Sequence, residues 1–187
     1  GNGRRDVPVC AALGECKMRL YRGKIELIAE EVIAALKASG AIEVDDPTEA
    51  KLDVESVLKE YLRLDREVVE EAKNRMEVRG LGYAQLGRVK SQVAKDRSAP
   101  AQDEVLPYLL DQILNILFHS NHVGEIFADD AEIRTTLTPV LRKHMEVDTE
   151  LDREVRSKIK NLEEGTSEFE IEYARVMGQI KQTKRLS

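Results

Sequence analysis

Two aspartates, Asp65 and Asp148, have the placement in this chain that most favours chemistry. Each falls on the apolar stripe of a long helical pattern, with apolar residues a turn away. If the two helices cross near their middles, the carboxylates meet and could hold a metal or perform acid–base catalysis. A buried carboxylate is costly unless it is paired. We therefore expect each to form a structural ion pair, or to lie where the stripe turns towards solvent.

A second candidate is a pair of histidines one helical turn apart, His119 and His122, close in sequence to Glu125 and Asp129. Imidazole and carboxylate groups together bind divalent ions such as zinc. The intervening stretch 120–124 is expected to unwind the helix, so the two rings need not share a face. The ligand set is also incomplete for zinc. We expect two helix-end histidines, favoured there by the helix dipole, and no metal site.

Basic side chains mark the final helical segment of each half of the chain. They are Arg88, Lys90, Lys95, Arg97, Arg175, Lys181, Lys184 and Arg185. Such charges can contact phosphates, so a nucleic-acid-binding accessory protein is one interpretation. Cations near helix C-termini are also favoured by the helix dipole, and neither segment alternates its cations with aromatic residues. We expect solvated helix faces and keep nucleic-acid binding as the alternative.

No other motif predicts catalysis. Gly80-Leu81-Gly82 links two helical segments and lacks the strand–turn–helix context of a phosphate-binding loop. No serine or cysteine has a credible general base nearby in the sequence. We expect a protein that is not an enzyme and that needs no cofactor.

The composition indicates a helical protein. Of 187 residues, 34% are charged, 42% are hydrophobic and only 4% are aromatic. High charge with few aromatic residues is typical of helices rather than β-sandwiches. The net charge of −6 is not usual for a DNA-binding protein. No apolar run approaches the roughly 20 residues of a membrane-spanning helix, and the default compartment is the cytoplasm.

The elements that position these residues recur along the chain. Ile42-Glu43-Val44-Asp45-Asp46 reappears as Ile126-Phe127-Ala128-Asp129-Asp130, and each copy opens a long amphipathic stretch. Self-similarity of this kind indicates a repeat architecture. We predict an all-α protein made of two tandem three-helix repeats, residues 18–97 and residues 98–187.

Helix boundaries follow from capping signals. In the first repeat we predict helices over about 25–40, 47–79 and 83–97, the long one beginning after an Asp-Pro-Thr-Glu cap and ending at Gly80. In the second we predict helices over about 104–120 and 167–184. Pro139 lies inside the second long stretch, where a proline costs about 3 kcal/mol, so we expect a kink or a restart there.

The long helices predict an interaction. A helix over residues 47–79 is roughly 50 Å long at ~1.5 Å per residue, about twice the length of its neighbours. Either the two long helices pair with each other, or one end projects towards a partner. The leading hypothesis is therefore a non-catalytic interaction or scaffold protein that binds another protein or its own copy.

Residues 1–17 look foreign to this pattern. They hold both cysteines, Cys10 and Cys16, and lack the apolar core of a signal peptide. Gly14-Glu15 can be encoded as a ribosome-binding sequence shortly before Met18. We expect translation to begin at Met18, with a disordered N-terminal tail as the alternative.

Three segments resemble a known family. They are the start Met18-Arg19-Leu20-Tyr21-Arg22-Gly23-Lys24-Ile25, the turn at 42–46 and the helix at 62–72. Together they are similar to the bacterial domain-of-unknown-function family five-oh-seven, from Met18 to the C-terminus. The resemblance implies a helical fold and carries no activity, cofactor or catalytic residue.

Overall fold

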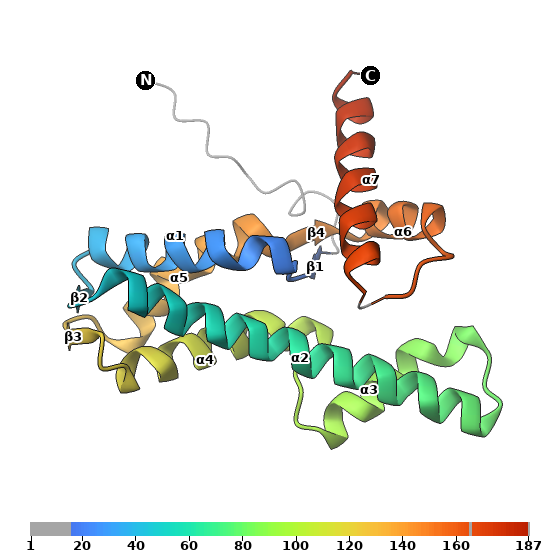
Figure 1. The fold of residues 1–187 in the computed structure, drawn as a ribbon, viewed down its shortest axis with the longest axis horizontal. Helices are drawn as coiled ribbons and strands as arrows, with labels where there is room; N and C mark the ends of the chain where they lie inside the picture. The colour runs from blue at the N-terminus through green and yellow to red at the C-terminus, as the bar shows by residue number, and fades with distance from the viewer. Residues whose placement is uncertain (1–15, 165, 187) are drawn as a thin grey trace. The chain divides into compact units, whose positions relative to one another are not determined.

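The computed structural model describes residues 16–164 and 166–186, and these residues are predominantly helical (Figure 1). The helices are α1 (Ile25–Ala38), α2 (Pro47–Arg79), α3 (Leu86–Asp96), α4 (Val105–His119), α5 (Asp130–Met145), α6 (Thr149–Lys158) and α7 (Ser167–Leu186). The strands are β1 (Cys16–Met18), β2 (Ile42–Val44), β3 (Val123–Ile126) and β4 (Glu146–Asp148). The prediction of an all-α protein is confirmed.

The chain folds as two compact units. The larger unit is Leu20–His144, and the smaller unit combines the described N-terminal residues up to Arg19 with the chain from Met145 onward. The boundary predicted between residues 97 and 98 falls inside the larger unit. Within that unit the order helix, strand, helix occurs twice, as α1-β2-α2 and α4-β3-α5. The tandem duplication itself stays a prediction.

Helix α2 is the longest element of the larger unit. Its N-cap is Asp46, whose carboxylate accepts a hydrogen bond from the Glu49 amide at 3.2 Å, and Pro47 occupies the first helical position. Its C-cap Gly80 has a φ of 63°, a left-handed conformation that glycine adopts without strain. Both predicted ends of this helix are confirmed.

The apolar face of α2 is buried along nearly its whole length. Helices α1, α4 and α3 all pack against it, and its buried residues extend from Ala50 to Met76. Val68, Ala72 and Met76 form one cluster with the apolar side of α3. The expectation that the long helix either projects or pairs with a second long helix is therefore wrong. The reason is that three shorter helices cover it in succession.

The repeated motif forms a two-stranded antiparallel ribbon. Ile42 of β2 pairs with Ile126 of β3, and Val44 pairs with Val123 across a register irregularity. The Asp45 amide extends the pairing by donating to the His122 carbonyl at 2.9 Å. The two copies of the sequence motif thus lie against each other at one end of the larger unit.

Each strand of this ribbon leads into an aspartate-capped helix. After β3, Asp129 accepts from the Glu132 amide at 2.8 Å, while the Glu132 carboxylate accepts from the Asp129 amide at 3.0 Å. This reciprocal capping box matches the predicted aspartate-to-glutamate spacing. The Asp46 amide, by contrast, donates to the His122 carbonyl at 3.3 Å across the ribbon.

The second long stretch is interrupted later than predicted. Of the kink or restart predicted at Pro139, the restart does not occur, because helix α5 continues through that residue. The chain leaves the helix at Glu146, where β4 pairs with β1, Glu146 lying opposite Met18. Asp148 then caps α6 by accepting from the amides of Glu150 at 2.8 Å and Leu151 at 3.1 Å.

The N-terminal boundary also needs correction. Cys16 and Lys17 belong to β1 and pair with β4, and Lys17 Nζ lies 3.6 Å from Asp152 Oδ2. They are therefore part of the fold of the smaller unit, contrary to the expectation for residues 1–17. Residues 1–15, with Cys10, lie outside the described part of the chain.

A buried carboxylate organises the smaller unit. Asp152 is only 3% exposed, and it accepts hydrogen bonds from the Tyr173 hydroxyl and from Arg156 Nε at 3.0 Å. Arg156 also donates both terminal nitrogens to Glu164, at 3.1 and 3.0 Å. A buried charge is costly unless it is paired and hydrogen-bonded, as Asp152 is here. Because Tyr173 belongs to α7, the same contacts hold α6 against α7.

Arg19 joins the N-terminal segment to the same cluster. Its guanidinium lies 4.6 Å from the ring centre of Tyr173 and 5.3 Å from that of Phe169, within the range of cation–π attraction. It is also 3.5 Å from Glu164. The segment before α1 is thus anchored by charge and stacking.

The Asp152 cluster predicts a large stability effect. Asp152→Ala leaves Tyr173 and Arg156 without their buried acceptor and should destabilise the smaller unit by about 3 kcal/mol. Urea unfolding of the full chain, with hydrogen exchange of α6 and α7 peptides, measures this loss. Glu150→Ala, at an exposed position of the same helix, is the control and should change stability by less than about 0.5 kcal/mol. Equal effects of the two substitutions would contradict this account.

A second ion pair joins α1 to α5 in the larger unit. His144 Nε2 lies 2.6 Å from Glu31 Oε2, with the His144 side chain only 6% exposed, and Lys143 Nζ lies 3.3 Å from Glu31 Oε1. The hydrogen bond from His144 is the main cause that holds the pKa of Glu31 below its ordinary 4.5.

This pair predicts an acid-sensitive contribution to stability. A lowered carboxyl pKa stabilises the fold above the ordinary value of 4.5, and the contribution is lost as pH falls through the lowered pKa. Glu31→Gln should remove that part of the decline when unfolding free energy is measured from pH 7 downward. Glu30→Gln, the exposed neighbour, should keep the wild-type decline. Identical pH profiles for Glu31→Gln and wild type would refute the assignment.

Candidate functional site

The most exposed apolar side chains among the described residues lie at the turn between α2 and α3. Val78 is 80% exposed and Tyr83 is 81% exposed. They flank a well-formed helix stop, in which the Gly80 amide donates to the Glu77 carbonyl and the Leu81 amide to the Met76 carbonyl, at 3.2 and 2.9 Å. The turn therefore presents Val78 and Tyr83 from an ordered backbone.

The same segment is strongly basic. Residues 73–95, from the last two turns of α2 to the residue before the end of α3, contain six Lys and Arg residues and one acidic residue, Glu77, and Asp96 follows directly. We call this segment the basic hairpin. Arg79, Arg88 and Lys95 are exposed, and the described residues provide no ion-pair partner for any of the three. These three cations are thus available to a ligand.

Ion pairs brace the base of the basic hairpin. Arg97, just beyond α3, donates to Glu67 at 2.9 Å and also to Glu71. Arg75 lies 2.8 Å from Glu71 and 3.0 Å from Asp96. These guanidinium groups, first Arg97 and then Arg75, hold the pKa of the Glu71 carboxyl below its usual value. These ion pairs join α2 to the end of α3, and none of them involves the turn between the two helices.

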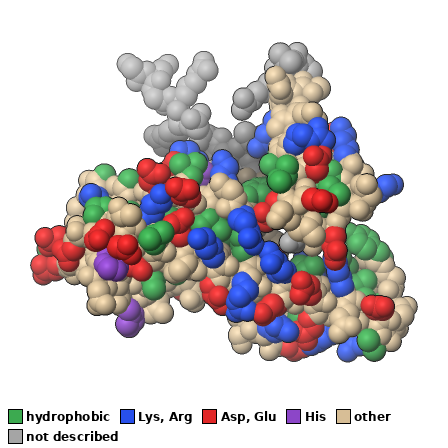
Figure 2. All heavy atoms as spheres, viewed as in Figure 1, with side chains coloured by type: hydrophobic (Ala, Val, Ile, Leu, Met, Phe, Trp, Pro, Cys, Tyr) green, Lys and Arg blue, Asp and Glu red, His purple; other side chains and the backbone are tan. Residues whose placement is uncertain are grey.

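The opposite end of α2 is acidic. Residues 41–50 and 120–133, which include the β2–β3 ribbon, contain no Lys or Arg. Their acidic residues are all exposed: Glu43, Asp45, Asp46, Glu49, Glu125, Asp129, Asp130 and Glu132. We call these two segments the acidic ribbon. Figure 2 shows acidic side chains gathered at the end that carries β2 and β3 in Figure 1.

Two exposed phenylalanines accompany the acidic ribbon. Phe127, directly after β3, is 63% exposed, and Phe118, in the last turn of α4, is 53% exposed. The Phe127 amide donates to the Ala41 carbonyl at 2.8 Å, so its backbone is fixed by the ribbon. Each end of α2 therefore combines charge of one sign with two large apolar side chains.

The basic residues predicted on α3 and α7 have different surroundings. On α3, Arg88 and Lys95 are exposed and Lys90 is half-buried. Arg97 is the residue of this set that is already held by Glu67 and Glu71. The first set therefore belongs to the basic hairpin, with Arg97 bracing it.

The second predicted set lies in the smaller unit on α7. Arg175 is paired with Glu172 at 2.6 Å, and Lys184 lies 3.5 Å from Glu154. Lys181 is exposed, and the side chain of Arg185 lies outside the described residues. Because two of these cations are already paired with carboxylates, α7 offers less free positive charge than the basic hairpin.

The two candidate aspartates have different surroundings, and that of Asp65 matches the expectation that the stripe turns towards solvent there. Asp65 is exposed on α2, although its pattern suggested an apolar stripe, while Asp148 is half-buried and caps α6. Each lies where the helix twists or ends, which takes the carboxylate off the apolar face. The buried aspartate is Asp152, one helical turn after Asp148. An arginine four residues later, Arg156, was the signal that could have identified it.

His119 ends α4 as predicted, whereas His122 lies in the turn between α4 and β3. His119 is exposed, with Nδ1 2.8 Å from the Asn115 carbonyl one turn earlier. His122 is half-buried, and its carbonyl accepts from the amides of Asp45 and Asp46 in the ribbon. Within residues 16–164 and 166–186 there is no group of three His, Cys, Asp or Glu side chains arranged to hold a metal ion.

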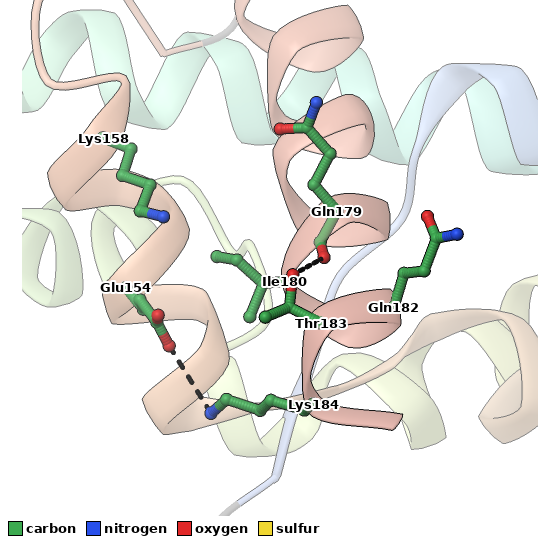
Figure 3. A pocket seen from close by; sticks show the side chains of 7 residues that line it. All are labelled: Glu154, Lys158, Gln179, Ile180, Gln182, Thr183 and Lys184. Carbon is green, nitrogen blue, oxygen red and sulfur yellow. Dashed lines mark hydrogen bonds and ion pairs between the residues drawn. The ribbon is translucent and has the colours of Figure 1, made fainter. Parts of the chain in front are cut away.

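A cleft of about 440 Å³ separates α6 from α7 in the smaller unit (Figure 3). Glu154 and Lys158 line it from α6, and Ile180 and Lys184 are among its residues from α7. The pair between Glu154 and Lys184, at 3.5 Å, occupies one side of it (Figure 3). Glu154 is the only carboxylate among the described residues that line the cleft, and it is already paired with Lys184. The cleft therefore resembles a surface groove more than an acid–base site.

Sequence reasoning missed the exposed turn at Val78 and Tyr83. A signal was present, because Tyr83 follows Gly80-Leu81-Gly82 and lies within the segment where cations outnumber acids. The segment spans two predicted helices. Its excess of cations is therefore not visible when charges are counted for each helix separately. None of the described helices is long and apolar enough to cross a membrane.

Comparison with known proteins gives a family without an activity. The family model described as "Protein of unknown function (DUF507)" matches residues 18–186. No functionally curated protein matches the chain in sequence. The match covers nearly all of the described residues, including both ends of α2 and the Asp152 cluster. The chain belongs to the DUF507 family.

Proposed function

We propose that this protein is a non-catalytic protein-interaction module that docks through the basic hairpin. The observation that carries the proposal is the exposure of Val78 and Tyr83, at 80% and 81%, among unpaired arginines. Tyr and Arg are enriched among the residues that dominate binding energy at protein interfaces. Single exposed apolar residues are ordinary, but Val78 and Tyr83 are five residues apart at one turn, in the segment that carries the exposed Arg79 and Arg88, and this grouping supports a docking surface.

Rigidity of the basic hairpin supports the same proposal. Val89 and Val93 of α3 pack with Val68, Ala72 and Met76 of α2 in one buried cluster. The paired Arg75 and Arg97 add cross-links at the base of the hairpin. A surface that is ordered before binding loses less conformational entropy on association, which favours affinity.

The buried charges suit a structural rather than a catalytic role. Asp152, the most buried carboxylate of the described residues, is held by Tyr173 and Arg156 and bridged through Arg156 to Glu164. An acid–base catalyst needs a proton-accepting position that faces substrate. This carboxylate instead joins two helices.

The proposal predicts that Val78→Ser with Tyr83→Ser weakens partner binding at least tenfold, since truncated interface hot spots cost about 2 kcal/mol or more. Global stability should change by less than about 0.5 kcal/mol, because both side chains are exposed. Binding is measured by titration against the partner identified by photo-crosslinking from position 83 in the native host. Ile171→Ser, at another exposed apolar position on α7, serves as the control and should leave affinity unchanged.

The crosslinking step can itself contradict the proposal. A photoreactive residue at position 83 should give discrete protein adducts that the same probe at position 171 does not give. If the two positions give the same adducts, the basic hairpin is not a specific docking surface.

The basic hairpin also favours nucleic-acid binding as a second candidate. An exposed aromatic ring beside arginines is the combination that binds single strands by stacking and charge. The net charge of −6 argues against it. This candidate predicts binding to a single-stranded oligonucleotide that weakens steeply with salt and is lost in Arg79→Glu with Arg88→Glu. RNA adducts, rather than protein adducts, at position 83 would favour it.

A further inference from the structure

We infer that the partner of the basic hairpin is the acidic ribbon of a second copy of this chain. The inference rests on the proposed function and names its partner. The association is head to tail, with the α2–α3 turn of one copy against the β2–β3 ribbon of the next.

Charge complementarity is the first argument. The acidic ribbon has eight exposed carboxylates and no Lys or Arg, whereas the basic hairpin has six cations and one acid. Opposite potentials on two surfaces accelerate encounter and fix their register. In a chain of net charge −6 the basic hairpin carries net positive charge, and the acidic ribbon offers it eight exposed carboxylates.

The geometry of α2 prevents the two surfaces from meeting within one larger unit. Asp46 and Gly80 cap opposite ends of this 33-residue helix. At ~1.5 Å per residue the ends are roughly 50 Å apart. The Debye length at physiological salt is about 8 Å, so neither end neutralises the other. Only another molecule can bring the opposite charges together.

Repulsion inside the acidic ribbon is a second and independent argument. Ile42 pairs with Ile126, and Val44 pairs with Val123. Glu43 lies between the first members of these two pairs, and Glu125 lies between the second members. The two glutamates therefore occupy neighbouring positions of adjacent strands. Like charges placed in this way destabilise a strand pair. A cationic partner such as Arg79 or Arg88 would relieve that repulsion on docking.

Exposed apolar side chains at both ends of α2 are the third argument, because they can add apolar burial to the attraction between the charges. Phe118 and Phe127 accompany the acidic ribbon, and Val78 and Tyr83 accompany the basic hairpin, all more than half exposed. Interfaces commonly bury aromatic residues at the centre, with charged residues at the rim. Each surface thus has a small apolar centre and a charged surround of opposite sign.

Head-to-tail contact has a consequence for assembly. A heterologous interface leaves one basic hairpin and one acidic ribbon free at the two ends of every dimer. Such contacts close into rings or extend into filaments, depending on the rotation between neighbours. Association should therefore grow with concentration beyond the dimer and weaken with salt.

Charge reversal at each end tests the inference. Arg79→Glu with Arg88→Glu changes the basic hairpin, and Glu43→Lys with Glu125→Lys changes the acidic ribbon without touching the helix-capping aspartates. Sedimentation velocity of the full chain at about 50 and 500 mM salt measures association. Each double variant should weaken self-association at least tenfold. The chain that carries all four substitutions should regain it, since opposite charges again face each other.

Matched controls keep the outcome clear. Lys158→Glu with Lys181→Glu gives the same change of net charge as the hairpin variant at exposed positions of the smaller unit, and should leave association unchanged. Circular dichroism checks that every variant is folded, and failure of the four-substitution chain to associate would overturn the inference. So would a wild-type chain that stays monomeric at low salt. If crosslinks from position 83 still reach a different protein, the proposed function survives and only the self-partner is wrong.

Discussion

Burial of the apolar face of α2 is the constraint on which the larger unit depends. This face spans 33 residues, and α1, α4 and α3 must all pack on it to remove it from water. Apolar burial contributes roughly 25 cal/mol per Å², so leaving half of such a helix uncovered would be costly. The apolar face of the long helix is therefore used in the fold and is not left open along its length.

The two ends of α2 carry opposite charge because a helix N-terminus and a helix C-terminus favour different residues. At the N-terminal end, aspartates cap α2 and α5, and acidic residues near helix N-termini are favoured by the helix dipole. At the C-terminal end, Gly80 turns the chain, and cations lie on both sides of Glu77. Capping alone does not require Tyr83 to be 81% exposed, or Glu43 and Glu125 to share a ribbon. These features are the ones on which the proposed interaction rests.

Local sequence rules predicted most helices closely and failed where distant segments meet. Asp46, Pro47 and Gly80 set the bounds of α2 through short-range capping, and these bounds are confirmed. Pro139 was expected to interrupt the second long stretch, but α5 continues through it. The actual break at β4 depends on pairing with β1, far earlier in the chain, and no local pattern around residues 146–148 contains that information.

The sequence by itself determined an all-α chain, the ends of α2 and the family, because helical periodicity and capping act over a few residues. Tertiary structure alone decided that Asp152 is buried, since its partners Tyr173 and Lys17 come from distant segments of the chain. It also decided that residues 16–19 complete the smaller unit and that two acidic motifs join in one ribbon. Such outcomes depend on long-range packing, which brings together side chains that the linear order keeps apart.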